Sequence, residues 1–142
     1  MDRFEPDDLG ADLLDTALKN DLVERSDLER VIAIGKAFGS PLDLLELIAL
    51  ALRAEGAVLY WRATIPADDP FDLPQFSVID DLGTEYYVRV VRWDATDGLG
   101  RGEAVVVPPP DRQASWVRIE ASRPSRSIGT SDDVHVAMVA LR

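Results

Sequence analysis

The sequence predicts a mainly β fold, either a sandwich or a barrel, preceded by a short N-terminal helical segment. From residue 57 onward, runs rich in β-branched and aromatic residues alternate apolar with polar positions, as strands do. Turn signals rich in Gly, Pro and Asp separate these runs at short intervals. Residues 7–22 instead carry leucines at helical spacing. With 142 residues, the chain has the length of one ordinary domain.

The N-terminal stretch DDLGADLLDTALKNDL, residues 7–22, predicts an amphipathic helix. Two aspartates in its first turn suit the positive end of the helix dipole, although a glycine follows them. This helix could dock on the body of the protein or bind the groove of a partner. We therefore divide the chain into an acidic helical segment, residues 1–26, and a β domain, residues 27–142. The apolar stripe consists of Leu9, Leu13, Leu14, Ala17 and Leu18.

The next part of the chain supports two interpretations. LERVIAI, residues 28–34, indicates a strand that the following Gly-Ser-Pro ends. SPLDLLELIALALRAEG, residues 40–56, could be a helix with Ser40 as its cap, because Leu, Ala and Glu favour helix. It could equally hold a buried strand that turns at Ala54-Glu55-Gly56. Local propensity alone favours the helix.

The remaining strands show clear alternation. Trp61 shares one face with Leu59 and Ala63 and is the expected core anchor. SWVRIEAS places Val117 and Ile119 on one face and charged residues on the other. The stretch DDLG is expected to turn the chain, and DGLGRG is expected to form a glycine-rich loop. These strands are expected around residues 58–65, 77–79, 84–93, 102–107, 115–122 and 133–142.

Five pieces of the chain, taken in order, resemble bacterial proteins that carry an uncharacterised immunoglobulin-like β-sandwich with a DDLGT-aromatic corner. The resemblance implies that residues 44–53 form a strand, and that the β domain is an antiparallel immunoglobulin-like sandwich. It implies no activity. The glycine-rich loop departs from the pattern, since it holds only Gly98, Gly100 and Gly102 and a charged RGE interrupts it. The pieces are LERVIAI, LIALALRAEGAVLYWRA, DDLGTEYY, DGLGRGEAVVVPP and WVRIEA, within residues 28–121.

Composition excludes several kinds of site and partner. The chain has no cysteine and one histidine, so thiolate metal sites, disulfides and multi-imidazole sites within one chain are excluded. A formal net charge of −11 opposes binding to nucleic acid and to anionic membranes. A local basic patch near Trp116 is conceivable, but a solvated strand face and a loop explain its arginines more simply. Those arginines are Arg112, Arg118, Arg123 and Arg126.

The N-terminus MDRFEPDDLG lacks the pattern of a secretory signal, and the longest apolar run is far shorter than a membrane span. We therefore expect a cytoplasmic protein. Arginine greatly outnumbers lysine, which indicates a GC-rich bacterial genome.

Acidic residues near two turns are the only metal candidates. The segment around Gly98 fails the EF-hand pattern, because Trp93 and Ala95 occupy ligand positions. It also fails the dinucleotide fingerprint, because Glu103 stands where the third glycine is required. Calcium binding at the loop end of the sandwich is therefore a minority hypothesis beside a solvated turn. Its candidate ligands are Asp80, Asp81, Glu85, Asp94 and Asp97.

No catalytic constellation stands out. If Val134, Val136 and Met138 of the last strand face the core, His135 faces solvent or the other layer, which is typical of a structural histidine. The leading hypothesis is a non-enzymatic interaction or structural module without a cofactor, whose partner is an unidentified protein or a second copy. Calcium or small-ligand binding is the first alternative, and a hydrolase-type enzyme using Asp80 or His135 is the second.

Overall fold

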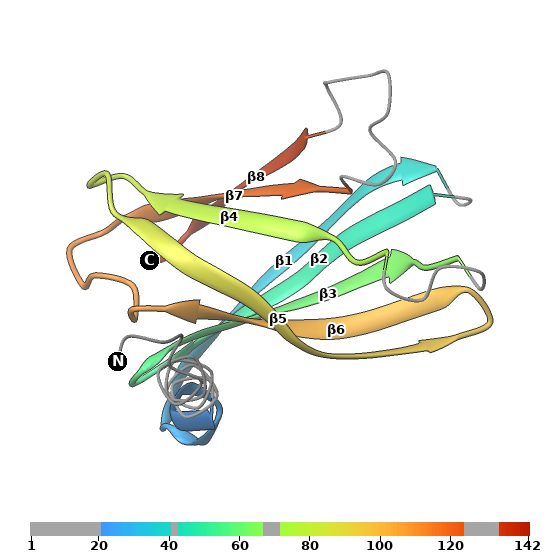
Figure 1. Cartoon of the computed structure of the whole chain (residues 1–142). Coiled ribbons are helices and arrows are strands. Elements are labelled where there is room, and N and C mark those ends of the chain that lie inside the picture. Colours follow the sequence, from blue (N-terminus) through green and yellow to red (C-terminus); the bar gives the residue numbers. More distant parts are fainter. Residues whose placement is uncertain (1–20, 41–42, 67–71, 124–133) are drawn as a thin grey trace, which may run out of the picture.

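The computed structural model describes residues 21–40, 43–66, 72–123 and 134–142. Within them, eight antiparallel strands form one sheet in the order β1-β2-β3-β6-β5-β4-β7-β8 (Figure 1). This confirms the predicted mainly β, antiparallel class. The strands are β1 (Leu28–Ser40), β2 (Asp43–Arg53), β3 (Gly56–Thr64), β4 (Gln75–Asp80), β5 (Glu85–Thr96), β6 (Leu99–Val107), β7 (Trp116–Ser122) and β8 (Val134–Ala140).

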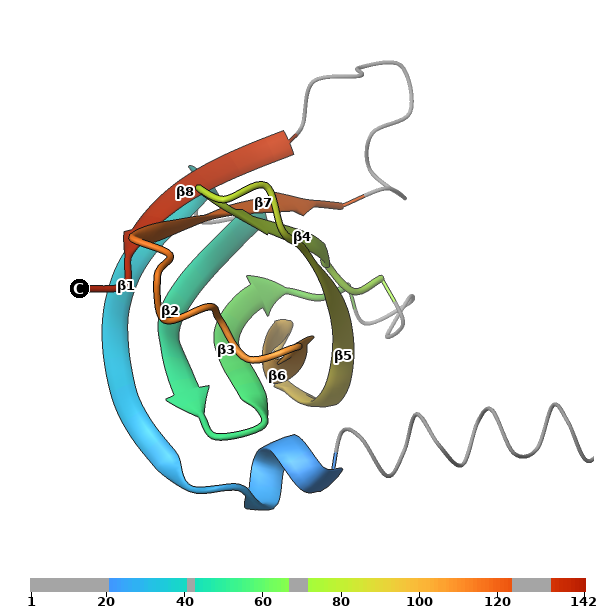
Figure 2. The same ribbon diagram turned by 90° about the vertical axis from the view of Figure 1, so that its left-hand side faces the viewer.

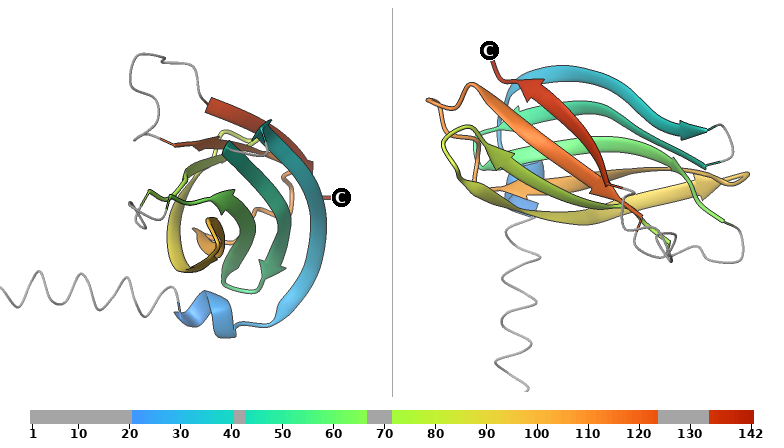
Figure 3. Two further views of the ribbon diagram at one scale, coloured as in Figure 1. Left: turned by 90° about the vertical axis from the view of Figure 1, so that its right-hand side faces the viewer. Right: turned by 90° about the horizontal axis from the view of Figure 1, so that it is seen from above.

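The sheet curls until it is nearly a barrel, so the predicted immunoglobulin-like sandwich is not confirmed. Figure 2 shows the strands circling one interior, and the edge strands β1 and β8 come together in Figures 2 and 3. Bulges between Leu47 and Ala49 in β2 and between Val90 and Arg92 in β5 assist this curling, because bulges bend a strand and increase its twist. The long strands therefore wrap around the core instead of forming two flat layers.

Apolar side chains fill the interior around Trp61, which is fully buried as predicted. Gly102 of β6 makes room for the Trp61 ring, and Gly100 makes room for Ile65. An added Cβ at Gly102 would meet the Trp61 ring and would lie 2.7 Å from the Arg92 carbonyl oxygen, and one at Gly100 would meet Ile65. The predicted glycine-rich loop is therefore wrong: the turn is confined to Asp97-Gly98, both with positive φ.

The ambiguous stretch is a strand, as the resemblance implies. Residues 43–53 pair with β1 on one side and β3 on the other. Leu45, Leu47 and Leu50 point into the core, so burial outweighs the local preference for helix.

The last strand is oriented opposite to the prediction. Ala137 and Val139 are buried, whereas Val134 and Met138 are about half exposed. His135 lies opposite buried Ala121, and its ring stacks on Phe38 of β1 with centroids 4.8 Å apart. As an edge strand, β8 tolerates large apolar residues on its outer face, while small inner residues fit the crowded interior.

The N-terminal helix prediction falls mostly outside the described residues. Within them, residues 21–25 are helical and pack on the outside of the barrel. A short link joins this helix to β1, which begins at Leu28.

Candidate functional site

The Asp80 carboxylate is the centre of a hydrogen-bonded corner between β4 and β5. Its Oδ1 accepts hydrogen bonds from the backbone N–H groups of Leu82 and Thr84, each at 2.9 Å. Its Oδ2 accepts one from the Tyr86 hydroxyl at 2.6 Å, and that hydroxyl accepts one from the Asp111 N–H at 3.3 Å. Gly83 completes the turn with φ of 86°. The corner thus joins three segments of chain, and DDLG turns the chain as predicted.

The protonation of this corner follows from its contacts. Burial of Asp80 raises its pKa, but hydrogen bonds from the Tyr86 hydroxyl and from the Thr84 and Leu82 backbone outweigh burial and hold the pKa below its usual value. Burial and the bond to Asp80 raise the pKa of Tyr86 to about 12. Near neutral pH, Asp80 is therefore an anion and Tyr86 a neutral donor. This is a stable structural pair, not an acid and a base poised to exchange a proton.

The five calcium candidates do not converge. Asp81 accepts a hydrogen bond from the Ser115 N–H at 2.9 Å, and Glu85 is exposed where β5 begins. Asp94 and Asp97 lie near the opposite end of β5 and in the hairpin beyond it. In the described part of the chain, no three acidic or histidine side chains are grouped so that they could hold a metal ion.

Two of the arginines that the sequence placed in a possible basic patch, Arg118 and Arg123, make other contacts. Arg118 pairs with Glu120 at 3.0 Å on a solvent face, as expected. Arg123 was expected in a loop, but it is buried and donates to the Thr64 carbonyl at 2.7 Å and to the Asp72 carbonyl at 3.0 Å. It also pairs with the Asp72 carboxylate at 3.4 Å. Arg123 thereby links the end of β7 to the end of β3 and to the segment before β4, whereas Arg126 lies outside the described residues.

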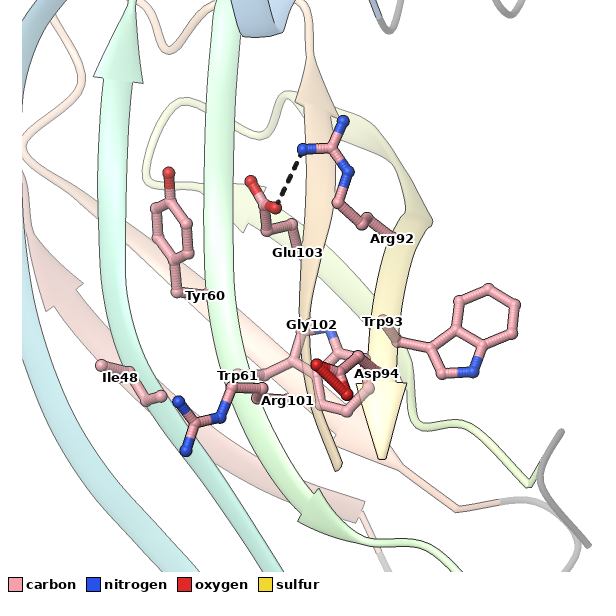
Figure 4. A pocket seen from close by; sticks show the side chains of 9 residues that line it. All are labelled: Ile48, Tyr60, Trp61, Arg92, Trp93, Asp94, Arg101, Gly102 and Glu103. Atoms are coloured by element: carbon pink, nitrogen blue, oxygen red, sulfur yellow. Dashed lines mark hydrogen bonds and ion pairs between the residues drawn. The ribbon is translucent and has the colours of Figure 1, made fainter. Parts of the chain in front are cut away.

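A shallow pocket of about 270 Å³ lies on the outside of β2, β3, β5 and β6 (Figure 4). Arg92 bridges Glu103 at 3.4 Å and Glu24 of the short helix at 2.9 Å. Trp93 points away from the other side chains in Figure 4. The lining residues that the structure describes include no serine or histidine, so a serine–histidine pair is not found among them. Its residues are Ile48, Tyr60, Trp61, Arg92, Trp93, Asp94, Arg101, Gly102 and Glu103.

Beside this pocket, the short helix is anchored to the barrel. Val23 is 1% exposed and packs on an apolar outer patch of β2, β3 and β6. Gly56 allows this approach, because a Cβ there would lie 2.8 Å from the Val23 side chain. The patch residues are Ala51, Val58 and Val105, with Tyr60, Val91 and Val107 around them.

Polar contacts fix the end of the same helix. Ser26 accepts a hydrogen bond from Arg53 through its carbonyl at 2.8 Å and one from the Glu55 N–H through its hydroxyl at 3.3 Å. The Ala54 N–H donates to the Asp27 carbonyl at 2.9 Å. The helix base is thus held by the β2–β3 turn as well as by Val23. Next to it, Leu22 and Tyr87 are 59% and 57% exposed, and they line a groove of about 430 Å³. Sequence periodicity predicted a helix over residues 7–22, mostly outside the described part, and it could not identify where residues 21–25 dock.

Comparison with known proteins adds a fold neighbour only. No family model and no curated protein matches the chain. It is similar to the crystal structure of the conserved domain protein from Bacillus anthracis, with a TM-score of 0.58 and 12% identity. The match covers 82% of this chain and 50% of that one, so the chain spans half the length of that protein. At this identity the likeness shows the fold alone. Across the described residues, we find no helix of the length and apolar character that a bilayer span requires.

Proposed function

We propose that this chain is a non-enzymatic protein-interaction module in which the barrel anchors an N-terminal amphipathic helix and offers the leucine side of that helix to a partner. The observation that carries this proposal is the contrast between two neighbouring residues: Val23 is buried on the barrel, and Leu22 is 59% exposed. In the described turn of the helix, Val23 therefore marks the side that contacts the barrel, and Leu22 marks an exposed side.

Helical spacing relates that docked side to the residues before it. Positions three, four and seven before Val23 share its side of a helix, and they are the polar residues Asn20, Lys19 and Thr16. Leu14 and Leu18 instead precede Leu22 by eight and four positions, on the exposed side. Residues 1–20 lie outside the described part, so this step rests on their sequence. It favours the partner-binding alternative over docking of the leucine stripe on the barrel.

Charge complementarity indicates the chemistry of the partner. The leucines are interspersed with aspartates at positions 7, 8, 12, 15 and 21, and the whole chain has a formal net charge of −11. Two such helices repel each other. A partner with an apolar groove or helix face bordered by lysine and arginine fits better than a second copy.

The test uses a synthetic amphipathic helix with a leucine face and lysine flanks, titrated calorimetrically into the full chain. We expect binding that weakens with salt, and loss of binding when residues 1–19 are deleted. Leu18→Asp should weaken binding about tenfold or more. Thr16→Asp, an equal charge change on the other side, is the matched control and should have little effect.

Three outcomes would overturn the proposal. The first is equal binding by the deletion variant, and the second is an equal effect of the two aspartate substitutions. The third is sedimentation that shows the full chain to be a dimer and the deletion variant a monomer, because the occupant would then be a second copy.

A further inference from the structure

The barrel has an open side between β4 and β5. The two strands pair only at Val78 with Tyr86 and at Ile79 with Glu85, directly beside the corner. Farther along, β4 stays paired with β7 and β5 with β6, but the two strands diverge from each other (Figure 1). Within the described ranges, no strand pairs with the β4-facing edge of β5 beyond Tyr86. Every second residue of such an edge directs its N–H and C=O groups outward, available to another strand.

A cavity of about 460 Å³ occupies this opening. Phe76 from β4 and Val88 and Val90 from β5 are half-buried and continue the barrel core to its surface. Gln75 and Phe76 of β4 line one side of the cavity, and Val88 to Val90 of β5 line the other. The volume lies in the range of sites for small ligands, and the walls are two strand edges above an apolar floor. The lining is completed by Leu73 and Pro74.

Arg89 supplies a charge at the outer rim. It is exposed, and no ion pair joins it to another residue in the described part of the chain. On a strand, neighbouring side chains point to opposite faces. An inserted strand would therefore place apolar side chains inward against Phe76 and Val88, and an acidic side chain outward against Arg89.

We propose that the gap between β4 and β5 binds a short extended peptide by strand addition, and that this peptide alternates apolar residues with an acidic residue facing Arg89. This surface is separate from the helix of the proposed function, so either can fail without the other. Main-chain hydrogen bonds supply affinity in this mode, and the alternating side chains supply specificity.

The probe is a synthetic peptide in which valine alternates with glutamate, and its controls are the lysine counterpart and an N-methylated version. By NMR on the full chain, we expect the glutamate peptide to shift the amide signals of residues 75–77 and 88–90 and to slow their hydrogen exchange. Arg89→Ala should weaken binding about tenfold. Arg89→Glu should transfer the preference to the lysine peptide. Because Arg89 is exposed, neither variant threatens the fold.

Strand addition requires the backbone of the ligand, so the N-methylated peptide should not bind. Equal binding of that peptide would overturn the proposal in favour of a simple apolar pocket. Signal shifts confined to the outer pocket near Tyr60 or to the helix face would overturn it as well, as would the absence of any shift at millimolar peptide. If the deletion of residues 1–19 abolished this binding, the surface would be the helix and not the gap.

Discussion

The curled sheet is interrupted at two places, and the two interruptions are bridged to different extents. At the β1–β8 seam, side chains bridge the two edge strands: Arg30 donates to the Leu141 carbonyl at 2.6 Å, and Phe38 stacks on His135. Between β4 and β5, the corner at Asp80 is densely hydrogen-bonded, and the strands then separate around a cavity. The β1–β8 seam is bridged by a side-chain contact near each end, whereas the β4–β5 opening is fixed at one end and open beyond it.

This difference teaches how an opening can persist in a stable fold. A free strand edge attracts other chains, and proteins usually cover or blunt it. Here the Asp80 corner holds the start of β5 against β4, while pairing with β6 supports the rest of the strand. The opening therefore does not depend on loose packing, which makes the corner and the seam separate targets for mutation.

The largest effect is expected at the corner. Asp80→Ala removes the acceptor of three hydrogen bonds and leaves the buried Tyr86 hydroxyl without an acceptor for its proton. We expect the free energy of unfolding to fall by roughly 3 kcal/mol, measured by urea denaturation followed by tryptophan fluorescence. Asp81→Ala, which removes one exposed hydrogen bond, is the control and should cost about 1 kcal/mol or less. Equal losses would mean that the corner is not organised by Asp80.

The same corner should respond to pH at both ends of the scale. The folded pKa of Asp80 lies below its usual 3.8, so its contribution is complete above 3.8 and is lost as pH falls through the folded value. The pKa of Tyr86 is raised from 10.0 to about 12, so its contribution is complete below 10.0 and is lost as pH rises toward 12. Unfolding curves of wild type and Asp80→Asn should converge in acid. Curves that stay parallel throughout the acid range would contradict this assignment.

Most strands could be predicted from the sequence, but β2 could not be assigned from local propensity, and the closure of the sheet could not be predicted. Alternation around Trp61 and Ile119 is a local signal, and the structure confirms it. The Gly100 and Gly102 prediction was wrong because glycine signals a turn locally, whereas here it makes room for side chains from the neighbouring strand. Whether eight strands make two layers or one curled sheet depends on bulges and register, which no short stretch of sequence encodes.

The site shows the same division between local and distant contacts. The DDLG turn was predictable, because an aspartate bonding to backbone a few positions ahead is local turn chemistry. Its link through Tyr86 to Asp111 was not, since that contact spans 25 residues. Arg123 was assigned to a loop because Pro, Ser and Gly follow it, but its partner Asp72 is 51 positions away. Composition describes neighbours in sequence, and these contacts join neighbours in space.

The β1–β8 seam should give a smaller effect than the corner. A double-mutant cycle with Phe38→Ala and His135→Ala measures the contact between the two rings directly. We expect a coupling energy of about 1 kcal/mol, because stacked aromatic pairs contribute that much beyond their burial. A cycle that pairs His135→Ala with Tyr87→Ala is the control and should give no coupling. A Phe38–His135 coupling as small as that of the control would show that the seam is not held by this stack.

The smallest expected effect is that of calcium, which we expect to leave the melting temperature unchanged. Both Asp80 oxygens accept hydrogen bonds within the corner, and one Asp81 oxygen accepts the Ser115 N–H. A calcium ion would have to displace these donors and would find Asp94 and Asp97 only near the other end of β5. Ligands that bind the native state raise the melting temperature by mass action. We therefore expect the same melting temperature in millimolar calcium and in chelator. A saturable rise that Asp80→Asn abolishes would instead make the corner a metal site, and its closed hydrogen-bond network would then have to open on binding.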